Sequence, residues 1–372
     1  METRRTRDLA EQPRRQNADG KDVDPTGSTG RGQGRKTGKP TLSDVAAAGG
    51  FSPSTVSRVL RRPESVSATM RQRVWRAVEE TGYVPNTAAR ALASARTNVI
   101  GVIVPSVTNS VFSDVLRGVF DALDGSAYQA QFGNANYSHL KEEQLVRLFL
   151  GQHPAALVVT GHDHTPAIDS MLRAAGCPVV QIMDLPPDPV DMAIGLSHAE
   201  AAAAGARHLI ERGYRRIAFL AAQMDMRTRA RMDGYIATLT AAGLFDERLL
   251  VTTHKPSSVA LGAQLCSEFL SRRPDGDAIL ANNDDIAIGA LFECQRRRVA
   301  IPDQIGICGF NDFDYAACVH PSMTSVTTRR YEMGRRAIDM AIAAAEGQAP
   351  KARLVDVGYQ LSARESTARR RT

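Results

Sequence analysis

The sequence predicts an α+β multidomain protein, in which a small all-helical domain near the N-terminus precedes a larger α/β domain of two lobes. Apolar residues recur at helical spacing between residues 41 and 81, whereas from Asn98 onward short apolar runs alternate with amphipathic segments. The chain has 372 residues, which is long for one core, and the alternating part of about 270 residues is too long for one parallel sheet. Two similar lobes are therefore expected after the helical domain.

Residues 1–40 are predicted to form a disordered basic tail, because they are rich in Arg, Gly, Gln, Thr and Asp and lack apolar periodicity. This tail carries ten Lys or Arg against six Asp or Glu, residues 41–96 carry eight against four, and the remainder has a net charge of −2. A basic front on a near-neutral body favours a polyanionic partner. A solvated surface would explain the charge alone equally well.

The stretch "TLSDVAAAGGFSPSTVSRVL", residues 41–60, predicts two short helices joined by a glycine turn. Thr41 and Asp44 have the spacing of a capping box, and Gly49–Gly50 is expected to end the first helix. Ser52 is a good N-cap for the second helix, and Pro53 suits its first position.

The second helix has two different faces. Its buried stripe is expected to contain Val56, Val59 and Leu60. Small hydroxyl residues and an arginine remain on or near the outer face: Ser54, Thr55, Ser57 and Arg58. Short side chains let a helix lie deep in a major groove, where hydroxyls and an arginine reach phosphates and base edges. The pattern predicts a DNA-binding helix-turn-helix, and the alternative is an ordinary small helical bundle.

Further short helices follow in the N-terminal part. A third helix is predicted from about Ala68 to Glu80, with Val74, Trp75 and Val78 as core residues. Residues 85–93, "PNTAARALA", form a proline-initiated, alanine-rich segment of roughly two helical turns. A helix this short is marginal without a partner, which fits folding on binding.

The α/β part offers several buried strands, and the clearest helices lie between them. The helix candidates include "FSDVLRGVFDAL" and "AEAAAAGARHLIERG". The strand candidates are "VIGVIVPS", "ALVVTG", "PVVQIMD", "RRIAFLAA", "DAILANND" and "IGICGF". This rhythm predicts parallel sheets with helices on both faces and a ligand at the carboxyl ends of the strands.

Several classes of protein are disfavoured. No stretch reaches 18 consecutive apolar residues, and the arginine-rich N-terminus lacks the apolar core of a signal peptide. The five cysteines are scattered without a C-x-x-C pair, which favours reduced, structural thiols in a cytosolic protein. The sequence contains no G-x-S-x-G, no dinucleotide fingerprint and no plausible metal cluster, so we expect neither an enzyme nor a cofactor.

Residues 41–94 resemble, without a gap, the DNA-binding head and hinge of the LacI/GalR family of bacterial transcription regulators. The elements "TVSRVL" and "GYVPNTAARALAS" carry this resemblance, and the family pattern continues to about residue 362. The resemblance implies that residues 85–93 are a hinge helix that orders on DNA, with Leu92 wedged between base steps in the minor groove. Pro53 and Ser54 are poorly suited to contact base edges, so the operator sequence of other family members cannot be assigned to this protein. The candidate DNA contacts are Thr41, Leu42, Ser43, Ser52, Pro53, Ser54, Thr55, Ser57, Arg58, Asn86, Arg90 and Leu92.

The same resemblance implies a periplasmic-binding-protein-like pair of lobes with three crossovers, one of them near Leu196, and a small ligand between the lobes. The elements "RMDGY" and "NNDDIAIGA" match family patterns, and they imply that Arg231, Asn283 and Asp284 face the cleft. A carboxylate and an arginine suit a polyol ligand, because the carboxylate accepts hydrogen bonds from hydroxyls and the arginine donates to an oxygen. Without the motif match, the favoured alternative would be that Arg231 and Asp284 form ion pairs that only support the structure. The candidate effector contacts are Ser106, Asn109, Phe112, His164, Asp184, Arg231, Asn283 and Asp284.

The loop "GHDH", residues 161–164, has polar residues too close together for a metal site and is expected at the cleft rim. Within the family, the likeness is to gluconate-operon repressors, in "VPSVTNSVFSDVLRGV", "HTP", "NNDDIAIGALFECQR" and "YEMG". This likeness implies a sugar-acid effector, with a neutral sugar or another small metabolite as the alternative.

The predicted function is a sequence-specific DNA-binding regulator, acting as a repressor and homodimer in the cytoplasm and controlled by a sugar or sugar acid. A sugar-binding protein without DNA binding would explain the lobes but not the helix-turn-helix. The tail after residue 362 lacks leucine heptads, which disfavours a coiled-coil tetramer. The expected domains are a tail (1–40), a helix-turn-helix domain (41–84), a hinge and linker (85–96) and an effector domain (97–365). Lobe 1 is expected at about 97–196 plus 312–328, and lobe 2 at about 197–311 plus 329–365.

Overall fold

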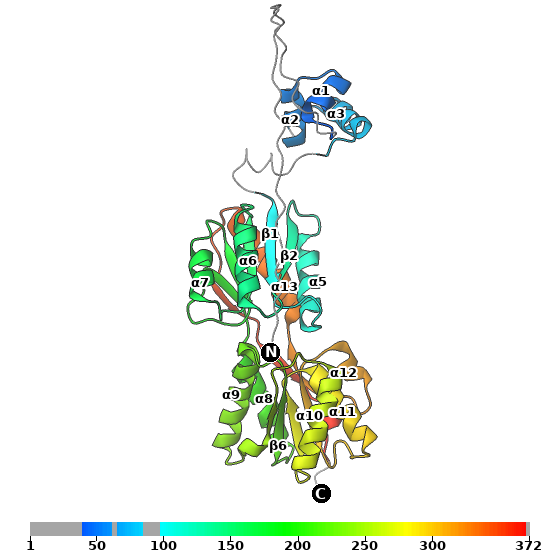
Figure 1. Ribbon diagram of the computed structural model, residues 1–372, viewed down its shortest axis with the longest axis vertical. Coiled ribbons are helices and arrows are strands. Elements are labelled where there is room, and N and C mark those ends of the chain that lie inside the picture. The colour runs from blue at the N-terminus through cyan, green and yellow to red at the C-terminus, as the bar shows by residue number, and fades with distance from the viewer. Residues whose placement is uncertain (1–38, 62–64, 85–96, 370–372) are drawn as a thin grey trace, which may run out of the picture. The chain divides into compact units, whose positions relative to one another are not determined.

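The computed structural model describes residues 39–61, 65–84 and 97–369 (Figure 1). The chain divides into two compact units at residues 86 and 87, here called the head and the body. Apart from residues 39 and 40, the predicted tail lies outside the described residues, as does the predicted hinge helix at residues 85–93.

The described part of the head contains the three predicted helices, α1 (Leu42–Gly49), α2 (Pro53–Arg61) and α3 (Ala68–Thr81). Their shared core is formed by Val45, Ala46, Val56, Val59, Val74, Ala77 and Val78. The prediction that Trp75 belongs to this core is wrong, because its side chain is 44% exposed. Helical spacing turns Val74, Ala77 and Val78 inward and leaves Trp75 on the solvent side.

Local capping fixes where the first two helices begin and end. Thr41 and Asp44 form the predicted capping box at the start of α1. Gly50 ends α1 with φ of 67°, a left-handed conformation that suits glycine. At the start of α2, the Ser52 hydroxyl accepts a hydrogen bond from the Thr55 N–H, so Ser52 is the N-cap as predicted.

The body contains two six-stranded sheets within its described residues, and the strand order follows the same pattern in both. The first sheet has the order β11-β5-β4-β3-β1-β2, with β1 (Val99–Val104), β2 (Gln129–Asn134), β3 (Ala156–Thr160), β4 (Val179–Met183), β5 (Met192–Gly195) and β11 (Leu354–Asp356). The second has the order β12-β10-β9-β8-β6-β7, with β6 (Ile217–Ala221), β7 (Leu250–Thr252), β8 (Ala278–Ala281), β9 (Gly306–Asn311), β10 (Thr324–Thr328) and β12 (Tyr359–Ser362). Neighbouring strands are parallel except β10 and β12.

Helices cover both faces of each sheet, as the strand pattern predicted. Around the first sheet lie α5 (Val111–Leu123), α6 (His139–Leu150), α7 (Pro166–Arg173) and α13 (Arg330–Ala345). Around the second lie α8 (His198–Glu211), α9 (Met226–Ala241), α10 (Val259–Arg272), α11 (Asp284–Arg296) and the short α12 (Asp314–Cys318). Successive side chains of a strand point to opposite faces of its sheet, so a strand of apolar residues needs helices on both sides. In β1, Val102 packs toward α5 and α13, while Ile103 packs toward α6 and α7.

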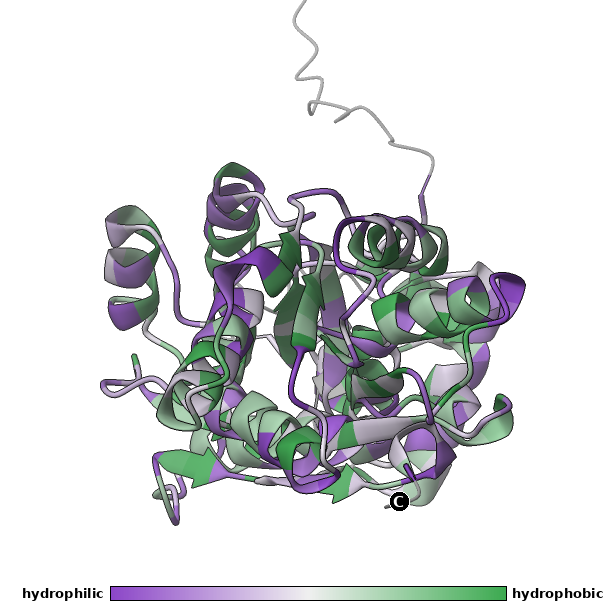
Figure 2. Ribbon diagram, turned by 90° about the horizontal axis from the view of Figure 1, so that it is seen from below, coloured by the Kyte–Doolittle hydropathy of each residue, from purple (hydrophilic) through white to green (hydrophobic). Residues whose placement is uncertain are grey.

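The apolar strands therefore lie inside the body, and the helices around them show mixed hydrophobic and hydrophilic residues (Figure 2). Among the described residues, no helix is both long and apolar enough to cross a membrane.

The predicted crossover near Leu196 lies between β5 and α8, but the predicted lobe boundaries are wrong at the C-terminal end. Residues 312–328 were expected in lobe 1, yet β10 pairs with β9 in the second sheet. Residues 329–365 were expected in lobe 2, yet α13 packs on α5 and β11 pairs with β5 in the first sheet. Within residues 97–369 the chain thus crosses between lobes near residues 196, 329 and 357.

Close helix packing explains why α13 belongs to the first lobe. A Cβ atom at Gly334 would lie 2.0 Å from the carbonyl oxygen of Val115, and one at Gly118 would lie 2.2 Å from that of Tyr331. Only glycines permit this approach of α5 and α13, a pairing that local sequence patterns do not reveal.

Candidate functional site

The first candidate site is the outer face of α2 in the head. The hydroxyl of Ser52 lies 2.9 Å from that of Ser54 and 2.8 Å from that of Thr55, so three hydroxyls gather at the helix N-terminus. Arg58 is exposed, whereas Val56 and Val59 are fully buried. The hydroxyls lie at the end where helices attract phosphate, and Arg58 adds a positive charge farther along the same helix.

The predicted DNA contacts in the described head differ in exposure. Leu42, Thr55 and Ser57 are half-buried. The exposed ones are Thr41, Ser43, Ser52, Pro53, Ser54 and Arg58. Asn86, Arg90 and Leu92 lie outside the described residues.

The second candidate site is the cleft between the two lobes of the body, at the carboxyl ends of the parallel strands. A wider cavity of about 440 Å³ and a narrow one of about 40 Å³ share Tyr137, Gln223, Asp225 and Arg227 as lining residues. Tyr137 follows β2 of the first lobe, and Arg227 lies in the first turn of α9 of the second. The two cavities are therefore parts of one cleft, which is where the strand pattern places a ligand.

Four of the eight predicted effector contacts line the narrow cavity: Asn109, Phe112, Arg231 and Asn283. Ser106 does not line either cavity; its hydroxyl accepts hydrogen bonds from the N–H groups of Thr108 and Asn109 and so shapes the loop. Asn109 in turn donates to the Tyr137 hydroxyl at 2.9 Å. The loop after β1 is thus tied to the loop after β2.

Arg231 is a buried cation whose hydrogen bonds within the described residues go to neutral acceptors. Its Nη1 donates to the carbonyl oxygen of Asn282 at 2.6 Å, and its Nε and Nη2 lie 3.2 and 3.1 Å from His198 Nδ1. The guanidinium carbon lies 3.9 Å from the centre of the Phe310 ring. Burial lowers the pKa of Arg231 to about 10; the charge of Asp225 opposes this shift in part, and the charge of Arg227 adds to it.

Arg227, one helical turn before Arg231, has the opposite environment. Its Nη2 donates to Asp225 at 2.9 Å, and its Nη1 lies 3.4 Å from Asp184 of the first lobe. Although burial disfavours its charge, the two carboxylates raise the pKa of Arg227. The predicted contact Asp184 therefore lies behind the cavity wall as a partner of Arg227, and burial raises the pKa of its carboxyl.

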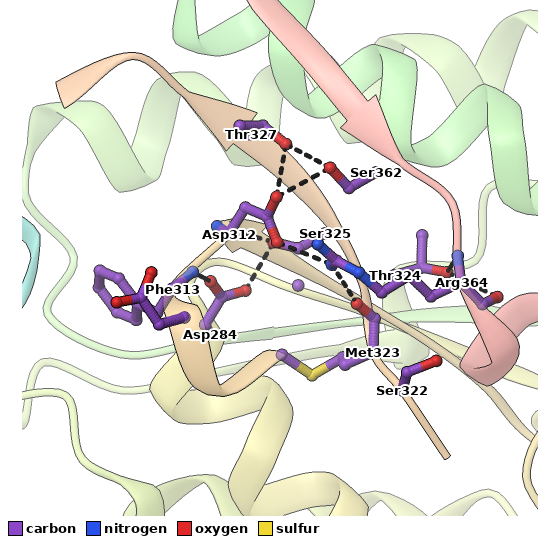
Figure 3. Close-up of polar contacts among 12 residues, drawn as sticks. Asp284, Asp312, Phe313, Ser322, Met323, Thr324, Ser325, Thr327, Ser362 and Arg364 are labelled. Carbon is purple, nitrogen blue, oxygen red and sulfur yellow. Dashed lines mark hydrogen bonds and ion pairs between the residues drawn. The ribbon is translucent and has the colours of Figure 1, made fainter. Parts of the chain in front are cut away.

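The prediction that Asp284 faces the cleft is wrong. Its side chain is fully buried, and its two carboxylate oxygens accept hydrogen bonds from the Phe313 N–H and the Ser325 hydroxyl (Figure 3). Burial raises the pKa of Asp284 to about 7. Asp284 anchors the start of α11 to the segment after β9, and its neighbours Asn283 and Asp285 line the cavity instead.

His164 lies beside the wider cavity without lining it. Its Nδ1 is 2.9 Å from Glu142, a lining residue, and its buried Nε2 has no hydrogen-bond partner in the described residues. Of the loop 161–164, Asp163 lines the cavity, in keeping with a position at the rim. Within the described ranges, no group of three or more His, Cys, Asp or Glu side chains could hold a metal ion.

Several lining residues were missed by the sequence reasoning: Tyr137, Gln223, Asp225, Arg227, Asn282, Asp285, Asn311 and Phe313. For Arg227, the four-residue spacing to Arg231 was a usable signal, since both lie on α9 and residues four apart share a helix face. No local signal identifies Tyr137, which reaches the cleft from a turn with φ of 54°.

Two parts of the chain match described protein families. Residues 41–86 match "Bacterial regulatory proteins, lacI family", and residues 206–367 match "Periplasmic binding protein-like domain".

Similar proteins extend over almost the whole chain. The HTH-type transcriptional regulator GntR of Pseudomonas aeruginosa is 41% identical over 333 residues, covering 90% of this chain and 97% of that protein. The regulator of the same name from Escherichia coli K12 is 36% identical over 327 residues, covering 88% and 98%. A solved LacI-family transcriptional regulator from Silicibacter pomeroyi has 36% identity and a TM-score of 0.84, covering 89% of this chain and 100% of that one.

Proposed function

The chain belongs to the lacI family of bacterial regulatory proteins, and we propose that it is a dimeric, operator-binding repressor whose cleft binds a sugar acid of the gluconate type. Its relatives over nearly the full length are named transcriptional regulators, so the chain is a transcriptional regulator and not an enzyme.

The head is proposed to bind the operator through α2. The exposed Arg58 and the three hydroxyls at the helix N-terminus support this role, since they can donate to phosphates and base edges. The hinge contacts Asn86, Arg90 and Leu92 remain predictions from the sequence resemblance.

One observation carries the sugar-acid proposal: Arg231 is a buried cation in the cleft, and the described residues offer its guanidinium only neutral acceptors. A buried charge without a counter-ion is costly, so an anionic ligand that supplies a carboxylate gains more here than a neutral one. A planar guanidinium also matches the two oxygens of a carboxylate.

The rest of the cleft suits a chain of hydroxyl groups. Asn109 and Asn283 line the narrow end near Arg231, and Tyr137 lines both cavities. Carboxylates line the wider cavity, where they can accept hydrogen bonds from hydroxyls: Glu142, Asp163 and Asp225. These acids would repel an anion, and Asp225 and Asp285 also line the narrow cavity. We place the effector's carboxylate at Arg231 because the hydrogen bonds of this guanidinium go to neutral acceptors, and we place the polyol end in the wider cavity.

A two-fold dimer is proposed because two helix-turn-helix heads can then occupy successive major grooves of a near-palindromic operator. Phe120 of α5 and Phe292 of α11 are 56% and 47% exposed, and a second copy would cover such side chains. Acting on chromosomal DNA, the protein is proposed to work in the cytoplasm and without a cofactor.

The test is calorimetry of the full chain with gluconate and with glucitol, which has a hydroxymethyl group in place of the carboxylate. We expect gluconate to bind at least about tenfold more tightly, as one charge-assisted pair provides. A gel shift with the promoter region of the neighbouring operon, with and without gluconate, tests control of DNA binding.

The sugar-acid assignment would be contradicted if glucitol or glucose bound as tightly as gluconate. It would also be contradicted if gluconate at millimolar concentration gave no binding signal. A neutral sugar would then be the better effector, an alternative that the three carboxylates of the wider cavity favour.

A further inference from the structure

Two arginines on one face of α9 differ in the acceptors that surround them. Arg227 lies between the carboxylates of Asp225 and Asp184. Arg231 faces the imidazole of His198 and a backbone carbonyl oxygen. Both line the cleft, but only the charge of Arg231 lacks a carboxylate partner in the part of the chain that the structure describes.

The hydrogen bonds of His198 define its tautomer. A guanidinium only donates, so His198 Nδ1, which is close to both Nε and Nη2 of Arg231, must be an acceptor without a proton. The ring proton is then on Nε2, 3.1 Å from the carbonyl oxygen of Met183 and 3.4 Å from Asp184 Oδ1. The imidazole is therefore neutral, and burial, Arg231 and Arg227 together hold the pKa of His198 well below its ordinary value.

His198 also connects the two lobes. It begins α8 directly after the first crossing, while Met183 ends β4 in the first lobe and lines the narrow cavity with Arg231. The ring is 4% exposed and lies 6.0 Å from the Phe310 ring, on which the Arg231 guanidinium stacks. Packing and two directed contacts thus fix the ring, and the ring fixes one edge of the guanidinium.

We propose that His198 is a positioning residue that determines effector specificity: it orients Arg231 through a neutral acceptor, which leaves the charge of Arg231 for the carboxylate of an anionic effector. This inference rests on the sugar-acid site proposed above. A carboxylate in place of the imidazole would hold Arg231 equally well but would neutralise it, as Asp225 and Asp184 do for Arg227.

The experiment compares His198→Asn with His198→Asp in the full chain, because these side chains have nearly the same shape and differ in charge. Gluconate and glucitol are titrated by calorimetry, and far-UV circular dichroism checks the fold. We expect Asn, whose amide oxygen can replace Nδ1, to stay within about threefold of the wild-type gluconate affinity. Asp should weaken gluconate binding at least about tenfold and leave glucitol binding unchanged.

Equal gluconate affinity of the Asn and Asp variants, or an equal loss for gluconate and glucitol in the Asp variant, would overturn the proposal. If the Asp variant does not fold, His198→Leu decides, since it fills the space but cannot accept a hydrogen bond. Leu should weaken gluconate binding at least about tenfold relative to Asn, and equal affinity would overturn the role of the acceptor. The wild-type preference for gluconate over glucitol tests the proposed function separately.

Discussion

Replacing Arg231 with Met is expected to abolish sugar-acid binding and yet to change the free energy of unfolding by no more than about 1 kcal/mol. The fall in the pKa of Arg231 to about 10 means that its buried charge costs about 3 kcal/mol, which Met removes. Arg231 also donates to two acceptors, His198 Nδ1 and the Asn282 carbonyl oxygen, and a hydrogen bond from a charged group contributes about 1.5–3 kcal/mol. At the lower end of this range the two contributions nearly cancel, while Met can still pack against the Phe310 ring.

The matched control is Arg227→Met on the same helix face. This change leaves the carboxylates of Asp225 and Asp184 buried without their cation, so the body should lose about 3–5 kcal/mol. Urea unfolding of the body is followed by far-UV circular dichroism, and the head is followed through Trp75, the single tryptophan of the chain. If Arg231→Met lost several kcal/mol and Arg227→Met lost none, the assignment of the unpaired cation would be refuted.

Three further predictions concern the head, the hinge and a buried acid. Arg58→Ala should weaken operator binding by about 1–3 kcal/mol with gluconate affinity unchanged, and an unaltered gel shift at fixed salt would remove Arg58 from the interface. Leu92→Ala should reduce the operator bend in a circular-permutation assay, and an identical bend would exclude the wedge. Because burial raises the pKa of Asp284 to about 7, the folded state holds this proton more tightly than the unfolded chain, and stability should fall as pH rises from about 4 to about 7. Asp284→Asn should flatten that dependence of the urea midpoint, and an unchanged slope would contradict the pKa shift.

Local chemistry made the head predictable. The capping box of Thr41 and Asp44, the left-handed Gly50 and the cap at Ser52 each depend on residues within four positions along the chain. The prediction for Trp75 was wrong because this residue lies beside the buried stripe of α3 rather than in it.

The cleft was predictable where a strand end or a motif identified it. Asn109, Phe112, Arg231 and Asn283 were named from such signals, and all four line the narrow cavity. Asp284 came from the same motif but turns away, since the first turn of α11 directs it toward β10 and its neighbours toward the cleft.

The sequence by itself determined the helix-turn-helix and the alternation of buried strands with amphipathic helices, because periodicity and capping act over a few residues. Its motifs also carried the resemblance to the family. Only the tertiary structure decided which lobe receives β10 and α13, because that choice depends on strand pairing and on helix contacts between distant segments. It also decided the partners of the two cleft arginines, bringing His198 to Arg231 and Asp184 to Arg227 across 33 and 43 residues. The sequence shows which side chains are charged, but whether a counter-ion compensates a charge depends on contacts that form only on folding.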